Sequence, residues 1–220
     1  EFEILENNKF FGGRFFGGPA PAYDEKTGWS YGGGGIFKNF RGRNEQLGGG
    51  IAVGGRNTFG ISYLNPWITG DHVSLAGGVA RADYQHPFLP YNVIINTMEL
   101  NVGRFFGYTK KVSLGFEIED MTFENDTTRL NYQYIAPQGF FHYDTRDLYA
   151  NPTKGILIKQ SFRGRVDFKG EGKNNFIWTQ SFSMYKRLSE IENPKPWILA
   201  LGFKTHINLG DKDQQFLNTM

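Results

Sequence analysis

Residues 112–119 read Val-Ser-Leu-Gly-Phe-Glu-Ile-Glu, and this short stretch decides the fold class. Apolar side chains occupy every second position, and serine, glycine and glutamate occupy the positions between them. Successive side chains of a β-strand point to opposite faces, so this period predicts a strand with one apolar face and one polar face. Helical periodicity is nearly absent from the chain.

The same alternation recurs along most of the chain. About ten segments show it, each about ten residues long, which is the length that a tilted strand needs to cross a bilayer. Turn-forming residues, such as Asn125-Asp126 and Asn193-Pro194, separate the segments. The predicted strands lie near 28–38, 46–55, 58–64, 72–83, 94–106, 111–123, 130–143, 155–167, 175–188 and 197–208.

The composition excludes several classes of protein. The chain has 220 residues, and it has no run of about 18 apolar residues, so a helical membrane protein is excluded. Lysine and arginine total 24 against 22 acidic residues, which gives no strong field for nucleic acid. The chain has no cysteine, so disulfides and thiolate zinc sites are excluded too.

The two faces of the predicted strands favour a membrane barrel. The second face is rich in glycine, alanine and serine, which suits the curved inner wall of a barrel, while the apolar face would meet lipid. Aromatic residues recur near segment ends, as in the interfacial girdle of such barrels. We therefore predict an all-β, transmembrane, antiparallel up-and-down β-barrel; a soluble β-sandwich is the alternative. The predicted girdle is Trp29, Tyr63, Trp67, Phe106, Trp178 and Trp197.

Three motifs carry a family resemblance. Residues 143–155 contain Asp-x-Arg-Asp followed by Asn-Pro-Thr-x-Gly, residues 39–50 start Asn-Phe-Arg-Gly, and residues 62–67 end in Asn-Pro-Trp. In this order they resemble the BamA/TamA superfamily of outer-membrane barrels. The signature positions are Asp144, Arg146, Asp147, Asn151, Pro152, Thr153 and Gly155. Their residue types predict a structural role, in which a charged cluster ties the strand end to the turn.

The resemblance also implies an architecture. Family members carry periplasmic docking repeats before the barrel, and residues 1–27 are too few for one, so we expect them to form an extended rim or plug segment. Residues 28–220 would form barrel strands. The family's inward Arg-Gly-Phe loop is missing, so about ten strands would be the N-terminal part of a barrel of roughly sixteen. A small barrel that closes with about ten strands is the alternative.

The resemblance implies a function without covalent catalysis. The glycines Gly32, Gly33, Gly34 and Gly35 would weaken the pairing of the first strand and leave a lateral seam. Family members use such a seam for the assembly or translocation of outer-membrane components. The expected partners are outer-membrane lipid of a Gram-negative bacterium, client barrels, accessory periplasmic proteins or a second copy, with no nucleic acid. A passive pore or anchor, or a soluble binding module, is the alternative.

Other chemistry has little support in the sequence. The four histidines have no partner at metal-ligand spacing, so we expect no metal and no cofactor. His142 and Asp144 can share a face, but no Gly-x-Ser-x-Gly motif supplies a nucleophile for a hydrolase.

Overall fold

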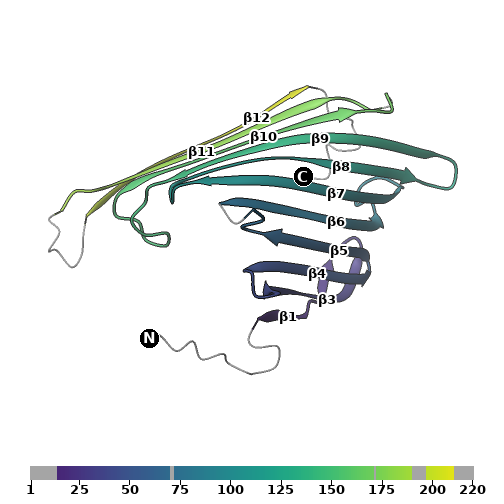
Figure 1. Cartoon of the computed structure of the whole chain (residues 1–220). Coiled ribbons are helices and arrows are strands. Elements are labelled where there is room, and N and C mark those ends of the chain that lie inside the picture. Colours follow the sequence, from purple (N-terminus) through teal and green to yellow (C-terminus); the bar gives the residue numbers. More distant parts are fainter. Residues whose placement is uncertain (1–13, 70–71, 171, 190–196, 211–220) are drawn as a thin grey trace. The chain divides into compact units, whose positions relative to one another are not determined.

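A computed structural model describes residues 14–69, 72–170, 172–189 and 197–210 (Figure 1). The regular structure of these residues consists of strands, and none of them forms a helix long and apolar enough to cross a membrane. The strands are β1 (Phe15–Pro19), β2 (Ala22–Asp24), β3 (Gly28–Phe40), β4 (Glu45–Gly54), β5 (Arg56–Asn65), β6 (Val73–Gln85), β7 (Asn92–Phe106), β8 (Lys110–Glu124), β9 (Arg129–Asp144), β10 (Gly155–Asp167), β11 (Asn175–Arg187) and β12 (Ile198–Gly210).

The described strands form one antiparallel sheet in up-and-down order. From β3 to β12 each strand is followed in the sheet by its successor in the chain. Strands β3 to β12 coincide, within a few residues, with the ten segments that the alternation predicts. The all-β up-and-down prediction is therefore confirmed, with twelve strands in the described part of the chain.

Strands β1 and β2 lie in the N-terminal segment. Within residues 14–24, the chain is extended and runs along one edge of β3. A rim or plug segment over residues 1–27 stays a prediction. Phe15 pairs with Phe37 and Pro19 with Gly33, while Ala22 pairs with Ser30. Proline lacks an N–H, and edge strands are where a sheet tolerates it. Residues 1–13 of the predicted segment lie outside the described residues.

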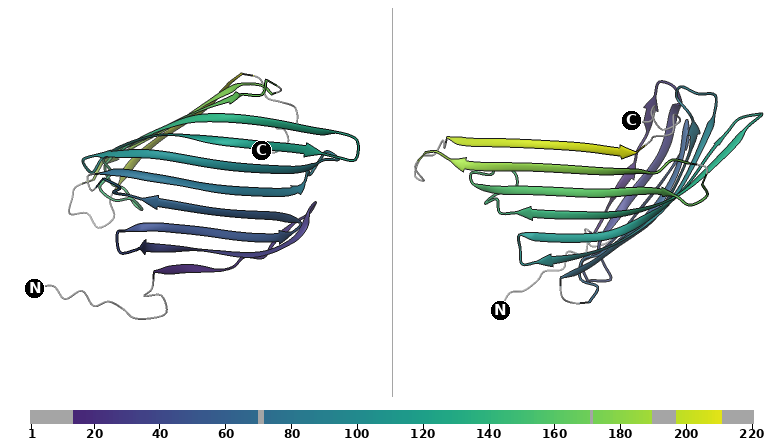
Figure 2. Two further views of the ribbon diagram at one scale, coloured as in Figure 1. Left: turned by 45° about the vertical axis from the view of Figure 1, so that its right-hand side comes forward. Right: turned by 90° about the horizontal axis from the view of Figure 1, so that it is seen from above.

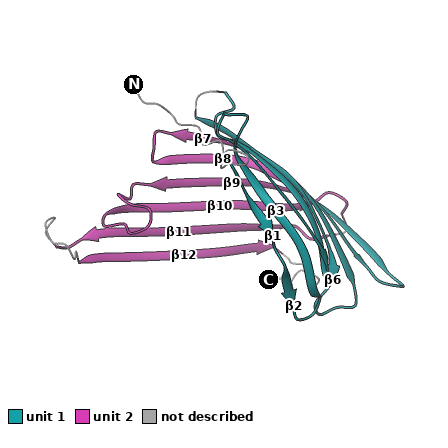
Figure 3. Cartoon of the chain, turned by 90° about the horizontal axis from the view of Figure 1, so that it is seen from below, with its two compact units in different colours: residues 1–100, 117–134 teal, residues 101–116, 135–220 magenta. Residues whose placement is uncertain are grey.

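The chain divides into two compact units, coloured separately in Figure 3. Unit 1 comprises residues 1–100 and 117–134, and unit 2 comprises residues 101–116 and 135–220.

In unit 1 a row of residues with little or no side chain crosses five neighbouring strands in register: Gly18, Gly34, Gly50, Gly60 and Ala80. The last four of these residues line an open groove of about 620 Å³. We call these five residues the glycine row.

Unit 2 contains a regular block of three long strands. Strands β10, β11 and β12 run side by side in the right view of Figure 2 and pair without a register shift. On one face, Phe162 stands beside Trp178 and Ile207, and Ile158 beside Phe182 and Phe203. The Phe162 and Trp178 rings stack with centroids 6.0 Å apart. This face of the block is predominantly apolar, and we call it the apolar face.

Large apolar side chains are exposed along the strands of both units. Ile61 in unit 1 is 47% exposed, and Leu114 and Phe203 in unit 2 are 68% and 57% exposed. These residues lie on the alternating faces that the sequence assigns to lipid. A barrel in a bilayer covers such faces with acyl chains, which is why they need no second protein layer.

A charge on the apolar side of a strand should be costly, whereas the same charge on the opposite side should not. Ile61 lies in the middle of β5, and Thr58 on the same strand lines the open groove of unit 1. We expect Ile61→Arg to lower the free energy of unfolding from lipid bilayers by about 2–4 kcal/mol. Thr58→Arg should cost much less, as measured by denaturant titration in lipid vesicles. Equal losses in the two variants would contradict the assignment of faces.

Candidate functional site

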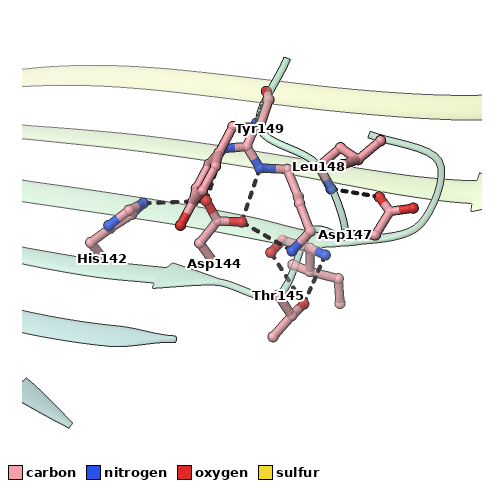
Figure 4. Close-up of polar contacts among 8 residues, drawn as sticks. His142, Asp144, Thr145, Asp147, Leu148 and Tyr149 are labelled. Carbon is pink, nitrogen blue, oxygen red and sulfur yellow. Dashed lines mark hydrogen bonds and ion pairs between the residues drawn. The ribbon is translucent and has the colours of Figure 1, made fainter. Parts of the chain in front are cut away.

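The signature segment forms a tight turn between β9 and β10 in unit 2, and an ion pair fixes its first part (Figure 4). Arg146 donates from Nε to Asp144 Oδ1 at 2.9 Å and from Nη2 to Asp144 Oδ2 at 2.8 Å. The Arg146 backbone N–H adds a third bond to the same carboxylate. The two side chains are only 13% and 6% exposed, so this bidentate pair is shielded from water. The bonds to Asp144 raise the pKa of the Arg146 guanidinium.

The second part of the turn is organised by Asp147. Its Oδ1 accepts the backbone N–H groups of Leu148 at 3.0 Å and Thr153 at 2.9 Å. Its Oδ2 accepts the Thr153 hydroxyl at 2.5 Å. The Thr153 hydroxyl, with the surrounding backbone N–H groups, holds the pKa of Asp147 well below its ordinary value. The carboxylate thus replaces the backbone partners that the turn residues lack.

Gly155 returns the chain to the sheet. Its φ of 111° is a conformation that residues with a side chain rarely adopt. A Cβ at this position would also collide with the carbonyl oxygen of Thr145 and lie 2.7 Å from Arg146 Cα. The turn therefore contains two hydrogen-bonded pairs, Asp144 with Arg146 and Asp147 with Thr153. Gly155 then starts β10. Asn151 and Pro152 lie in the turn between Asp147 and Thr153.

The two upstream motifs meet in unit 1, which the sequence did not predict. Arg41, in the turn after β3, forms a bidentate pair with Glu45 at 2.8 and 2.9 Å. Arg41 also donates to the Tyr63 hydroxyl at 3.3 Å, and Asn65 donates to Glu45 at 3.3 Å. Glu45 is completely buried, so these bonds compensate the loss of its hydration. Asn39, Arg41 and Asn44 adopt positive φ angles, so this turn has an unusual backbone shape that residue spacing alone does not reveal.

The glycine segment of the predicted seam is paired on both sides. Gly33, Gly34 and Gly35 pair with β1 on one side and β4 on the other, and Gly32 pairs with β4 while its carbonyl accepts the Ala20 N–H. On the N-terminal side of the described sheet, the outermost strand is therefore β1 and not the Gly32–Gly35 segment. A weak seam at Gly32–Gly35 stays a prediction.

The predicted girdle residues lie mostly at strand ends. Trp29 stacks on Tyr31 with ring centroids 5.9 Å apart, at the start of β3. Trp67 follows β5, Phe106 ends β7, and Trp197 directly precedes β12. Tyr63 is tied to Arg41, and Trp178 lies inside β11 against Phe162. A girdle at the membrane interfaces stays a prediction.

The histidine next to the signature has no catalytic geometry. His142 Nε2 lies 3.9 Å from Asp144 Oδ2, too far for a hydrogen bond. The nearby Thr145 hydroxyl is bonded to the backbone of Ile156. Among the described residues, no three histidine or acidic side chains gather where they could hold a metal ion.

Replacement of Arg146 by lysine should destabilise the protein. Lysine cannot form the bidentate pair, so a shielded carboxylate loses one of its charged bonds, at a cost of about 1–3 kcal/mol. Denaturant titration in detergent would measure the loss. Arg129→Lys is the matched control, because Arg129 is 73% exposed and lies 3.8 Å from Glu124, and exposed pairs contribute little. Equal stability of both variants would show that the signature pair has no structural role.

The turn should also make stability depend on pH through Asp147. Since the folded pKa lies below the unfolded value of about 3.9, the stabilisation is complete above that value and is lost as the pH falls toward the folded pKa. Asp147→Asn should lower the melting temperature at pH 7 and reduce its fall below about pH 4. Asp126→Asn, in another turn, is the control, since the Asp126 side chain makes none of the described hydrogen bonds. The same pH profile in parent and Asp147→Asn would contradict this role.

Comparison with known proteins places this geometry in a family. The model described as the Omp85 superfamily domain matches residues 39–219. A crystal structure of BamA from Haemophilus ducreyi lacking POTRA domains 1-3 is similar, with a TM-score of 0.63 and 19% sequence identity. The match covers 91% of this chain and 41% of the BamA chain, and at this identity it shows the fold alone. No curated protein matches the chain. Because the family model covers most of the chain and the strands follow the up-and-down order of a barrel, the protein belongs to the Omp85 superfamily of outer-membrane β-barrels.

Proposed function

We propose that this barrel acts in the assembly or translocation of outer-membrane components, and that the outer edge of β1 is the template for an incoming strand. The proposed location is the outer membrane of a Gram-negative bacterium. The role needs only backbone pairing and no covalent chemistry, so neither a cofactor nor a catalytic residue is involved. The single observation that carries the proposal is the backbone pattern of β1.

The hydrogen bonds between β1 and β3 define which groups of β1 point outward. The Lys38 N–H donates to the Arg14 carbonyl, and the Ala20 N–H donates to the Gly32 carbonyl. Because bonded residues alternate along an antiparallel strand, the backbone groups of Phe15, Gly17 and Pro19 point away from β3. Pro19 has no N–H, so the outer edge offers donors only at Phe15 and Gly17.

This edge is short but anchored. Strand β1 has five residues, whereas β3 has thirteen. The Phe15 ring packs against Phe37 with centroids 4.8 Å apart and covers Gly35, where a Cβ would collide with it. Lys38 lies over the Phe16 ring, 4.9 Å from its centroid. These contacts hold β1 on β3, so exchange of partners would take place at its outer edge, where few hydrogen bonds have to break.

The proposed partners follow from this edge. Outer-membrane lipid would surround the apolar faces, and client barrels would pair with β1. Accessory periplasmic proteins or a second copy of the chain are further partners of the kind that barrel assembly uses. The chain spans 41% of the BamA chain that it matches, so the activity of the complete protein stays a proposal.

Photo-crosslinking tests the edge directly. A photoreactive phenylalanine at Phe15 should crosslink an unfolded client barrel that is added to liposomes containing the protein. The same residue at Phe59 is the control, because Phe59 is 45% exposed against 41% for Phe15 but lies on the paired strand β5. Crosslinks of equal yield at both positions would contradict a specific edge.

Client folding in the same liposomes separates the proposal from a passive pore. The protein should accelerate the appearance of the folded, heat-modifiable form of the client relative to empty liposomes. Ion conductance together with an unchanged folding rate and no crosslink at Phe15 would identify a passive pore or anchor instead.

A further inference from the structure

The face of β10–β12 opposite the apolar face of unit 2 carries a cluster of basic and hydroxyl side chains. Lys159 on β10, Ser181 on β11 and Lys204 on β12 stand side by side in register. The next row along the same face is Ser161, Thr179 and His206. Both lysines and His206 are exposed. We name these six residues the lysine–hydroxyl cluster.

The register brings the polar groups of the cluster close together. Directly opposed side chains have Cβ atoms about 5 Å apart. Thr179 Oγ1 lies 3.0 Å from His206 Nδ1, so these two side chains of the second row are in contact. Lysine presents three N–H donors on a flexible stem, and hydroxyl groups can donate to the same acceptor. Two cations on either side of a serine thus form a convergent set of donors.

The strands that carry the cluster hold little negative charge on the same face. Along the described parts of β10, β11 and β12, the same face holds one carboxylate, Asp167 at the end of β10. Asp167 lies six residues beyond Ser161, about 20 Å along the strand, and accepts the backbone N–H groups of Lys169 and Gly172. In β9, Asp144 is held by Arg146.

Further cations lie close to the cluster. Lys159 and Lys111 lie near the His142 ring, as does the carboxylate of Asp144. Lys111 lies over the Phe105 ring, 4.9 Å from its centroid, so it too is oriented within unit 2. Within unit 2, Lys111 on β8 is therefore a further cation, and the carboxylate of Asp144 is already paired with Arg146.

We infer that the lysine–hydroxyl cluster binds a phosphate group on the interior face of the barrel. A phosphate offers several charged acceptor oxygens, which lysine ammonium groups bind as point charges and to which hydroxyl groups can donate. Its negative charge would relieve the repulsion between Lys159 and Lys204. The site lies in unit 2 and uses no residue of β1, so it can exist whether or not the proposed seam does.

Calorimetric titration of the intact barrel in a non-ionic detergent, with pyrophosphate as the probe, tests this inference. We expect a dissociation constant below about 1 mM and about a tenfold loss of affinity in either Lys159→Gln or Lys204→Gln. Lys186→Gln is the matched control, because Lys186 is an exposed lysine on the opposite face of β11, and its affinity should equal that of the parent. Gel mobility of the folded barrel verifies that each variant is folded.

A second arm identifies the source of the phosphate. Dihexanoyl phosphatidic acid replaces pyrophosphate in the same titration. Tighter binding of the lipid, lost in Lys159→Gln, would indicate a lipid headgroup, and equal binding would indicate a water-soluble phosphate compound. Absence of binding by either probe, or equal affinities of the parent and the two cluster variants, would overturn the inference. Equal losses in Lys186→Gln and the cluster variants would overturn it too.

Discussion

The backbone hydrogen bond is the interaction on which this structure depends, because acyl chains offer no partner for an unpaired N–H or carbonyl group. A strand that crosses the hydrocarbon region must therefore pair on both edges, and in the described sheet β3 to β11 meet this requirement. The side chains then only have to suit the two environments, apolar outside and polar inside. The modest mean hydropathy of −0.46 is the average over both faces and conceals a lipid-facing surface.

The turns obey the same constraint by different means. In the signature turn, Asp147 accepts backbone N–H groups that no strand can pair, while Asp144 and Arg146 hold the turn against β9. In the turn after β3, Arg41 and the buried Glu45 perform the equivalent task. Both devices use a bidentate arginine–carboxylate pair, whose fixed geometry defines how one strand leaves the sheet and the next one enters it.

The long strands could be predicted from the sequence, because a period of two along about ten residues has no other common explanation. Strand β1 could not be predicted, since Gly17, Gly18 and Pro19 leave only Phe15 and Phe16 to show a pattern. The Asp144–Arg146 pair was predictable because its members are two residues apart. The contacts of Arg41 and Glu45 with Tyr63 and Asn65 were not, because they depend on the register between β4 and β5.

The glycine row of unit 1 has a mechanical consequence. When a sheet bends, side chains on its concave face are pressed together, and their van der Waals repulsion resists further bending. Along Gly18, Gly34, Gly50, Gly60 and Ala80 there is almost nothing to compress. We therefore expect the sheet of unit 1 to bend more easily along this row than where large side chains face each other. Because the row ends at Gly18, bending along it would shift the position of β1.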